Sequence, residues 1–198
     1  MSEILFIRHA ETDSVGTFCG SSDPDVNDSG MEQIAGLLAG WRGEKRFGGP
    51  VEAVFTSDLM RAKTTAEALA GAFDLTCTVR PGLREIDFGA WEGLSWDEIW
   101  ESHREYAERW IAEFPKLPAP DGEPYEAFRE RVLAEVKELS ELAQGRQIAV
   151  VTHAGVLRVI LMELLGVNEA AAWERTRGYC CVVAYGIETK PRRKVERR

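Results

Sequence analysis

The chain has 198 residues, of which 44% are hydrophobic and 29% are charged, and its formal net charge is −9. This length and composition are typical of one ordinary globular domain, and they exclude a disordered or fibrous protein. No apolar run approaches the roughly 20 residues that a membrane-spanning helix needs. The acidic balance argues against nucleic acid as a partner. The first residues, MSEILFIRHAET, lack the basic region and cleavage site of a signal peptide, so we expect a cytoplasmic protein.

Apolar runs alternate with segments of helical period along most of the chain. We expect strands at residues 4–7, 51–56, 77–79, 147–152 and 179–187, and helices at 59–73, 125–143, 155–165 and from a capping Asp28 onward. Alternation of this kind predicts a mostly parallel sheet with helices on both faces. The expected fold is therefore an α/β three-layer sandwich, with one domain over residues 1–189 and a solvated basic tail over 190–198.

Residues 89–124 interrupt the alternation. This segment holds four of the six tryptophans and ends in the proline-rich stretch FPKLPAPDGEP. An insertion that is rich in aromatic residues and closes on prolines predicts a small helical cap over one end of the sheet. Trp96 and Trp100, at helical spacing, are expected in the core of this cap.

Two histidines occupy equivalent places in the predicted sheet. His9 follows the apolar strand ILFI, and His153 follows the strand IAVVT. In open α/β sheets, ligands bind outside the carboxyl ends of the strands, so we expect the two imidazoles to face each other across one crevice. Three histidines and four cysteines without metal-ligand spacing predict no metal site.

Four ordered motifs strengthen this expectation. They are RHAET at residues 8–12, SDLMRAKTTA at 57–66, LREIDFGAWEG at 83–93 and THAGV at 152–156. Together they resemble the signature segments of the histidine phosphatase superfamily, whose fold is that of the phosphoglycerate mutases. The resemblance implies the fold of that superfamily, a phosphoryl-transfer reaction and a set of site residues.

The resemblance assigns a role to each residue of its motifs. His9 is the nucleophile that takes the phosphoryl group, and Glu85 is the acid that protonates the leaving alcohol, in competition with Asp87 and Glu92. Arg8, Arg61 and His153 are the donors to the phosphate oxygens, a set suited to the charge that phosphoryl transfer spreads over three oxygens. The neighbouring guanidinium groups should keep His9 neutral. No metal or cofactor is expected.

A turn after the first motif, FCGSSD at residues 18–23, is similar to a glycine turn that offers backbone donors to substrate in this family. Cys19 and Gly20 are therefore candidate substrate contacts. Two departures stand nearby: Ala10 takes the place of a usual glycine, and Val15 that of a usual asparagine. Ala10 is expected to add a methyl group close to the phosphate, and Val15 implies that one phosphate donor is missing or comes from elsewhere.

The expected function is hydrolysis of a phosphate monoester of a small metabolite. The stretch FGAWEGLSWDEIW is similar to the α-ribazole phosphatase branch, which makes α-ribazole 5'-phosphate one candidate substrate. Two alternatives stay open at this point. One is a cofactor-dependent phosphoglycerate mutase, although the short segment between Glu85 and His153 predicts a site open to water. The other is an inactive module that binds a phosphorylated ligand. The oligomeric state is left open.

Overall fold

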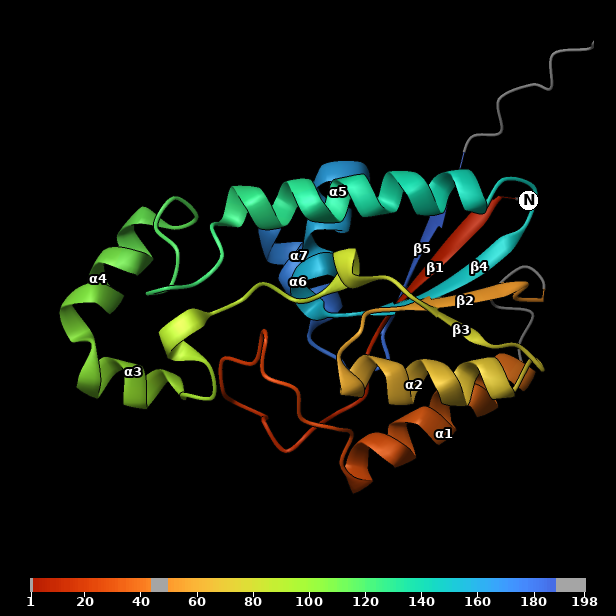
Figure 1. Cartoon of the computed structure of the whole chain (residues 1–198), viewed down its shortest axis with the longest axis horizontal. Helices are drawn as coiled ribbons and strands as arrows, with labels where there is room; N and C mark the ends of the chain where they lie inside the picture. Colours follow the sequence, from red (N-terminus) through yellow and green to blue (C-terminus); the bar gives the residue numbers. More distant parts are fainter. Residues whose placement is uncertain (1, 44–49, 188–198) are drawn as a thin grey trace, which may run out of the picture.

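The computed structural model describes residues 2–43 and 50–187. In chain order the elements are β1 (Glu3–Arg8), α1 (Asp28–Gly43), β2 (Ala53–Thr56), α2 (Met60–Gly71), β3 (Cys77–Val79), α3 (Trp96–Ser102), α4 (Arg104–Glu113), α5 (Tyr125–Leu142), β4 (Gln147–Thr152), α6 (Ala154–Val159), α7 (Glu169–Thr176) and β5 (Val182–Gly186) (Figure 1). The predicted basic tail, residues 190–198, lies outside the described residues. No helix within the described ranges is both long enough and apolar enough to cross a bilayer.

The five strands form one sheet in the order β3-β2-β4-β1-β5. The first four are mutually parallel, and β5 runs antiparallel to β1 at one edge. All six residues of β4 are buried, as expected for a central strand that is covered on both faces. The predicted α/β sandwich is confirmed.

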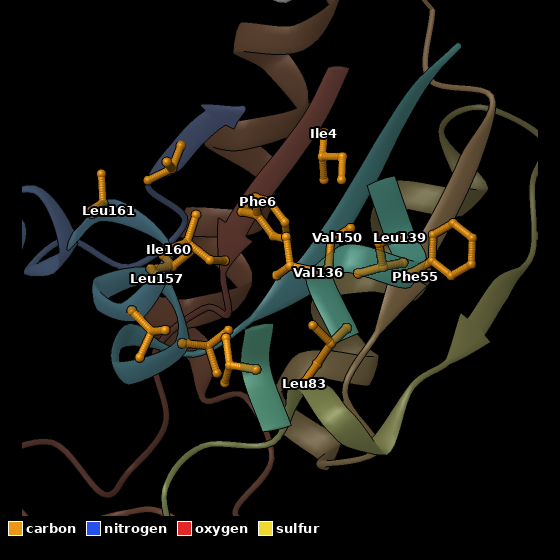
Figure 2. Packing of buried hydrophobic residues seen from close by; sticks show 14 of the residues in the cluster. Ile4, Phe6, Phe55, Leu83, Val136, Leu139, Val150, Leu157, Ile160 and Leu161 are labelled. Atoms are coloured by element: carbon orange, nitrogen blue, oxygen red, sulfur yellow. The ribbon is translucent and has the colours of Figure 1, made fainter. Parts of the chain in front are cut away.

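Helices cover the two faces of the sheet with separate cores. On one face, side chains of β1, β2 and β4 such as Phe6 and Val150 pack against α5 and α6 (Figure 2). On the other face, Ile7, Val54 and Val151 pack against α2, with α1 further out. Successive side chains along each strand point to opposite faces of the sheet and so contribute to both cores in turn. Close packing on both faces therefore fixes the position of the strand ends.

The segment predicted as a cap forms a third, aromatic cluster beyond the end of the sheet. Trp91 is fully buried at its centre, with Trp96, Trp100 and Trp110 packed around it. Ser95 begins α3 with a capping box, because its hydroxyl accepts from Glu98 N–H while the Glu98 carboxylate accepts from Ser95 N–H. In Figure 1 the cap helices α3 and α4 stand clear of the sheet, at the far end of α5.

Two details of the sequence prediction were wrong, and a third, the helix over 155–165, is present with a change of helical type. The cap of α1 is Asn27, whose side-chain oxygen accepts from Gly30 N–H at 2.8 Å, and not Asp28. The helix expected over 155–165 is α6 followed by a π-helical turn, Ile160–Leu164. The last strand starts at Val182 and not at 179, because Cys180 adopts a left-handed backbone conformation with a φ of 55°.

Candidate active site

The two histidines predicted at strand ends lie next to each other. The neighbouring parallel strands β1 and β4 are in register, with Arg8 opposite Thr152, so His9 and His153 leave the sheet at the same level. The ring centroids are 5.1 Å apart. His9 lines a cavity of about 270 Å³, here called the histidine pocket, whereas His153 is fully buried and is not part of its lining. The lining residues are Arg8, His9, Thr12, Ser14, Gly16, Thr17, Phe18, Cys19, Arg61, Glu85, Phe88, Trp96, Ala154, Arg158 and Tyr179.

The tautomer of His9 is set by its neighbour. Nδ1 lies 2.7 Å from the carbonyl oxygen of Ala10, which can only accept, so Nδ1 carries the proton. Burial, followed by the charge of Arg61, lowers the pKa of His9 to about 3; the Ala10 bond opposes this shift and Arg8 adds to it. The ring is therefore neutral near pH 7, with an unprotonated Nε2. Such a nitrogen is a nucleophile.

His153 is oriented in the opposite sense. Its Nε2 lies 2.8 Å from the Ser57 hydroxyl, which also accepts from Leu59 N–H, and we assign the hydroxyl proton to the bond with Nε2. Nδ1 then holds the proton of the neutral ring. Burial first, and then the neighbouring His9 and Arg61, hold the pKa of His153 well below its usual value. His153 is thus a neutral donor through Nδ1.

Arg61 reaches the histidine pocket from the first turn of α2 and is 1% exposed. Its two terminal nitrogens donate to backbone carbonyls of the turn after the first motif: Nη1 to Ser22 at 2.6 Å, and Nη2 to Gly20 at 2.8 Å and Cys19 at 3.3 Å. These bonds fix the plane of the guanidinium. They also tie the turn to α2.

Arg8 is held from the other side. Nη1 donates to the carbonyls of Thr176 and Arg177 at 2.9 Å and 2.7 Å, at the end of α7. The guanidinium carbon lies 4.0 Å from the centre of the Tyr179 ring, close enough for a cation–π contact. Both arginines are therefore placed before any ligand binds.

Three donors around His9 are buried without a partner in the described part of the chain: Arg8 Nε, Arg61 Nε and His153 Nδ1. A buried donor without an acceptor destabilises a fold, so three of them in one place call for an explanation. An anion with several oxygens, such as phosphate, supplies acceptors to all three at once. The pattern indicates an anion site in contact with His9 Nε2.

Glu85 is held at the start of α6. Its Oε2 accepts from Gly155 N–H at 2.8 Å and its Oε1 from Ile86 N–H at 3.0 Å. A Cβ at position 155 would lie 2.1 Å from Oε1, so only glycine admits the carboxylate there. Among the three carboxylates that competed for the role of acid, Glu85 alone lines the histidine pocket.

Glu92 has a different task. Its carboxylate accepts from the backbone N–H groups of Gly20, Ser21, Ser22 and Phe88, at 2.9 to 3.1 Å. Burial raises the pKa of Glu92, but the bonds from Ser22, Phe88 and Ser21 outweigh it and the net pKa is lowered. Glu92 is thus a partly buried anion that holds the turn carrying the acceptors of Arg61.

The turn therefore differs from its sequence prediction. Cys19 lines the histidine pocket, but the N–H of Gly20, expected to face a substrate, donates to Glu92 instead. Ala10 is fully buried and outside the pocket lining, with its N–H donated to Thr65 Oγ1 at 3.0 Å. Val15 is 57% exposed and also outside the lining.

Several lining residues were not singled out from the sequence. Thr12, Ser14 and Thr17 line the histidine pocket on either side of the position of the missing asparagine, and the Thr17 hydroxyl donates to the Ser14 carbonyl at 2.9 Å. Arg158, one turn beyond Gly155 on α6, could have been found from helical spacing. Tyr179 could not, because its contacts in the pocket, with the Arg8 guanidinium and with the His9 ring at 5.8 Å, join residues from opposite ends of the chain.

The family model of the histidine phosphatase superfamily (branch 1) matches residues 4–197 of this chain. The chain belongs to this superfamily. Phosphoserine phosphatase 1 of Hydrogenobacter thermophilus is 30% identical over 175 residues, which cover 87% of this chain and 81% of that protein. The adenosylcobalamin/alpha-ribazole phosphatase of Escherichia coli strain K12 is 28% identical, covering 94% of this chain and 91% of its own length. The crystal structure of the alpha-ribazole phosphatase from Shigella flexneri superposes with a TM-score of 0.81 at 26% identity, covering 94% and 91% of the two chains.

These matches confirm the predicted family and fold, and the prediction of a phosphatase for small metabolites. They favour neither the mutase nor the inactive binding module.

Proposed function

We propose that this chain hydrolyses phosphate monoesters of small metabolites through a phosphohistidine on His9. One observation carries the proposal: His9 presents an unprotonated Nε2 at a place where three buried donors lack an acceptor. A phosphate group bound there accepts from Arg8, Arg61 and His153 while its phosphorus faces the imidazole nitrogen.

The first step transfers the phosphoryl group to the protein. The Nε2 lone pair of His9 forms a bond to phosphorus as the bond between phosphorus and the ester oxygen breaks. Glu85, in its protonated form, gives its proton to the departing alkoxide. The donors stabilise the charge on the three phosphoryl oxygens without moving, because the bonds to backbone carbonyls already fix both guanidinium groups.

The second step regenerates the protein. The Glu85 carboxylate takes a proton from water as the water oxygen attacks phosphorus, and the bond from phosphorus to His9 breaks. Inorganic phosphate leaves. Gly155 N–H and Ile86 N–H hold the carboxylate in place during both proton transfers.

The positive charge for this chemistry comes from side chains. In the described part of the chain, no cluster of three or more histidine, cysteine, aspartate or glutamate side chains could hold a metal ion. A relative from Arabidopsis thaliana, 30% identical over 86% of this chain, is named a metal-independent phosphoserine phosphatase. We extend that property to this chain, and we place the reaction in the cytoplasm. α-Ribazole 5'-phosphate and phosphoserine are the substrates that the relatives suggest.

Phosphate release from a panel of phosphorylated metabolites, after exhaustive treatment with a chelator, tests the proposal. We expect turnover to survive chelation and to be lost in His9→Ala. His103→Ala, which changes a cap histidine outside the histidine pocket, is the control and should leave turnover intact. Loss of turnover on chelation, with recovery on addition of magnesium or zinc, would contradict the proposal.

A further inference from the structure

A second cavity, of about 730 Å³, adjoins the histidine pocket. Four residues line both: Phe18, Phe88, Trp96 and Arg158. A molecule whose phosphate group sits at His9 therefore extends past these side chains into the larger space. We call this space the apolar cavity.

The two walls of the apolar cavity come from distant parts of the chain. Trp110, Ile111 and Phe114 on and just after α4 form one wall, and Met162 and Trp173 near α7 belong to the other. Three of these side chains are among the large hydrophobic residues that stay exposed: Ile111 at 55%, Phe114 at 43% and Trp173 at 49%. Exposed apolar side chains gathered around one hollow are typical of a ligand site.

Arg158 stands at the junction of the two spaces. Its guanidinium carbon lies 3.3 Å from the centre of the Trp173 ring, and its Nε donates to Thr176 Oγ1 at 3.1 Å. Stacking on Trp173 fixes the cation beside the path from the histidine pocket into the apolar cavity. The charge of Arg158 is thus available to an ester group that spans both.

The charged groups of the apolar cavity are otherwise acidic. Four carboxylates line it, and Arg158 is the one cation among its described lining residues. Two of the carboxylates already have partners, since Glu123 is paired with Arg131 and Glu163 with Arg129. A substrate with a carboxylate of its own would meet like charge and lose its hydration here, which disfavours it.

We infer that the apolar cavity binds the alcohol part of the substrate, and that this chain selects phosphate esters of bulky apolar or aromatic alcohols over small amino-acid phosphates such as phosphoserine. The inference rests on the proposed function, because it takes the phosphate to be bound at His9. The four shared residues make the apolar cavity continuous with the histidine pocket. We therefore place the leaving group of the substrate in the apolar cavity.

A series of unbranched alkyl phosphates from methyl to n-hexyl tests the inference. Their leaving groups are all primary alcohols of similar acidity beyond the shortest, so the chemical step changes little while apolar area grows. We expect kcat/KM to rise by roughly fourfold per added methylene, the factor that follows from the transfer free energy of a buried methylene. Phosphoserine should fall below n-butyl phosphate.

Two variants separate the apolar cavity from hydrophobicity in general. Phe114→Ser removes a side chain of the cavity wall, and Leu142→Ser removes one of similar exposure at the end of α5, outside the cavity. We expect the rise with chain length to flatten in the first variant and to persist in the second. Equal slopes in both variants would overturn the inference.

Binding is read separately from turnover with the matching alkyl phosphonates, which cannot be hydrolysed, by titration calorimetry. Affinity that grows with chain length in the wild-type protein supports the inference even where turnover fails. Affinity and kcat/KM that are both flat with chain length, while turnover still depends on His9, would overturn the inference and leave the proposed function standing. Turnover that persists in His9→Ala would instead overturn the proposed function.

Discussion

The histidine pocket and the apolar cavity share four lining residues but are built in different ways. The histidine pocket lies at the ends of two central, fully covered strands, and its polar groups are fixed by bonds to backbone atoms. The apolar cavity lies between the cap helix α4 and helix α7, and its wall includes exposed aromatic side chains. The contrast suggests a division of labour, in which the sheet ends supply a reaction common to all substrates and the cap supplies the preference among them.

This division makes a testable distinction. Substitutions in the histidine pocket should lower the turnover of every alkyl phosphate by a similar factor. Substitutions in the apolar cavity should change the ranking of the substrates.

The largest effect is expected from Glu85→Gln. Without a proton to give, the variant should hydrolyse alkyl phosphates about 10²- to 10⁴-fold more slowly, and nitrophenyl phosphate nearly as fast as before, because nitrophenolate leaves unaided. The measurement is kcat for the two ester types. A loss of equal size for both would show that Glu85 is not the leaving-group acid.

Gly155→Ala should reproduce that signature without touching the carboxylate. The new Cβ would lie 2.1 Å from Glu85 Oε1 and displace it. Gly178→Ala is the matched control, since a Cβ there meets nothing within 4 Å. Kinetics of Gly155→Ala that match the control would mean that the position of Glu85 is not set by α6.

Arg61→Ala comes next, with an expected loss of about 10²- to 10³-fold in kcat/KM, the usual effect of removing one donor from a developing charge. The loss should be nearly the same for methyl and n-hexyl phosphate. Arg84→Ala removes an exposed arginine paired with Asp58 and serves as the control. A loss that grows with chain length would break the distinction between the two spaces.

Glu92→Gln should have a milder effect, about tenfold in kcat/KM, because it acts on Arg61 only through the turn. The folded pKa of Glu92 is lowered from 4.5, so its contribution to stability is full above that value and is lost as pH falls through the folded pKa. Thermal unfolding from about pH 5 to about pH 3 should therefore show a smaller drop in Tm for the variant than for the wild type. Parallel curves would argue against this role.

The smallest effect is expected from Val15→Asn. The side chain is 57% exposed and lies outside the histidine pocket, so restoring the asparagine usual in the family should change kcat/KM by less than about threefold. Steady-state kinetics with n-butyl phosphate provide the measurement. A rise of more than about tenfold would mean that the segment around Val15 reaches the bound phosphate.

The sequence predicted most of the sheet and the histidine pair, and the reason is local. The runs ILFI and IAVV are apolar throughout, and a residue that follows a buried parallel strand emerges at the edge where ligands bind. Helix α7 was missed, although Asn168 caps it by accepting from Ala171 N–H at 3.0 Å, because its 8 residues are too few for a helical period to stand out in the sequence.

Long-range pairing limited the prediction of the site. No residue near Gly20 in the sequence indicates that the Gly20 N–H donates to Glu92, because 72 positions separate the two residues. The same holds for the apolar cavity, whose walls carry Phe114 and Trp173 from opposite sides of α5 and β4 in the sequence. Patterns of neighbouring residues carry no signal of such contacts.

Trapping the covalent intermediate on His9 tests the proposed mechanism most directly. The protein is mixed with a labelled alkyl phosphate, quenched within the first turnover in alkaline denaturant, digested and sequenced by mass spectrometry. We predict a phosphoryl group on His9 that is stable to alkali and lost in acid, and its absence from His9→Ala. Release of phosphate with no label on His9, or label on another residue such as Cys19, would contradict the mechanism.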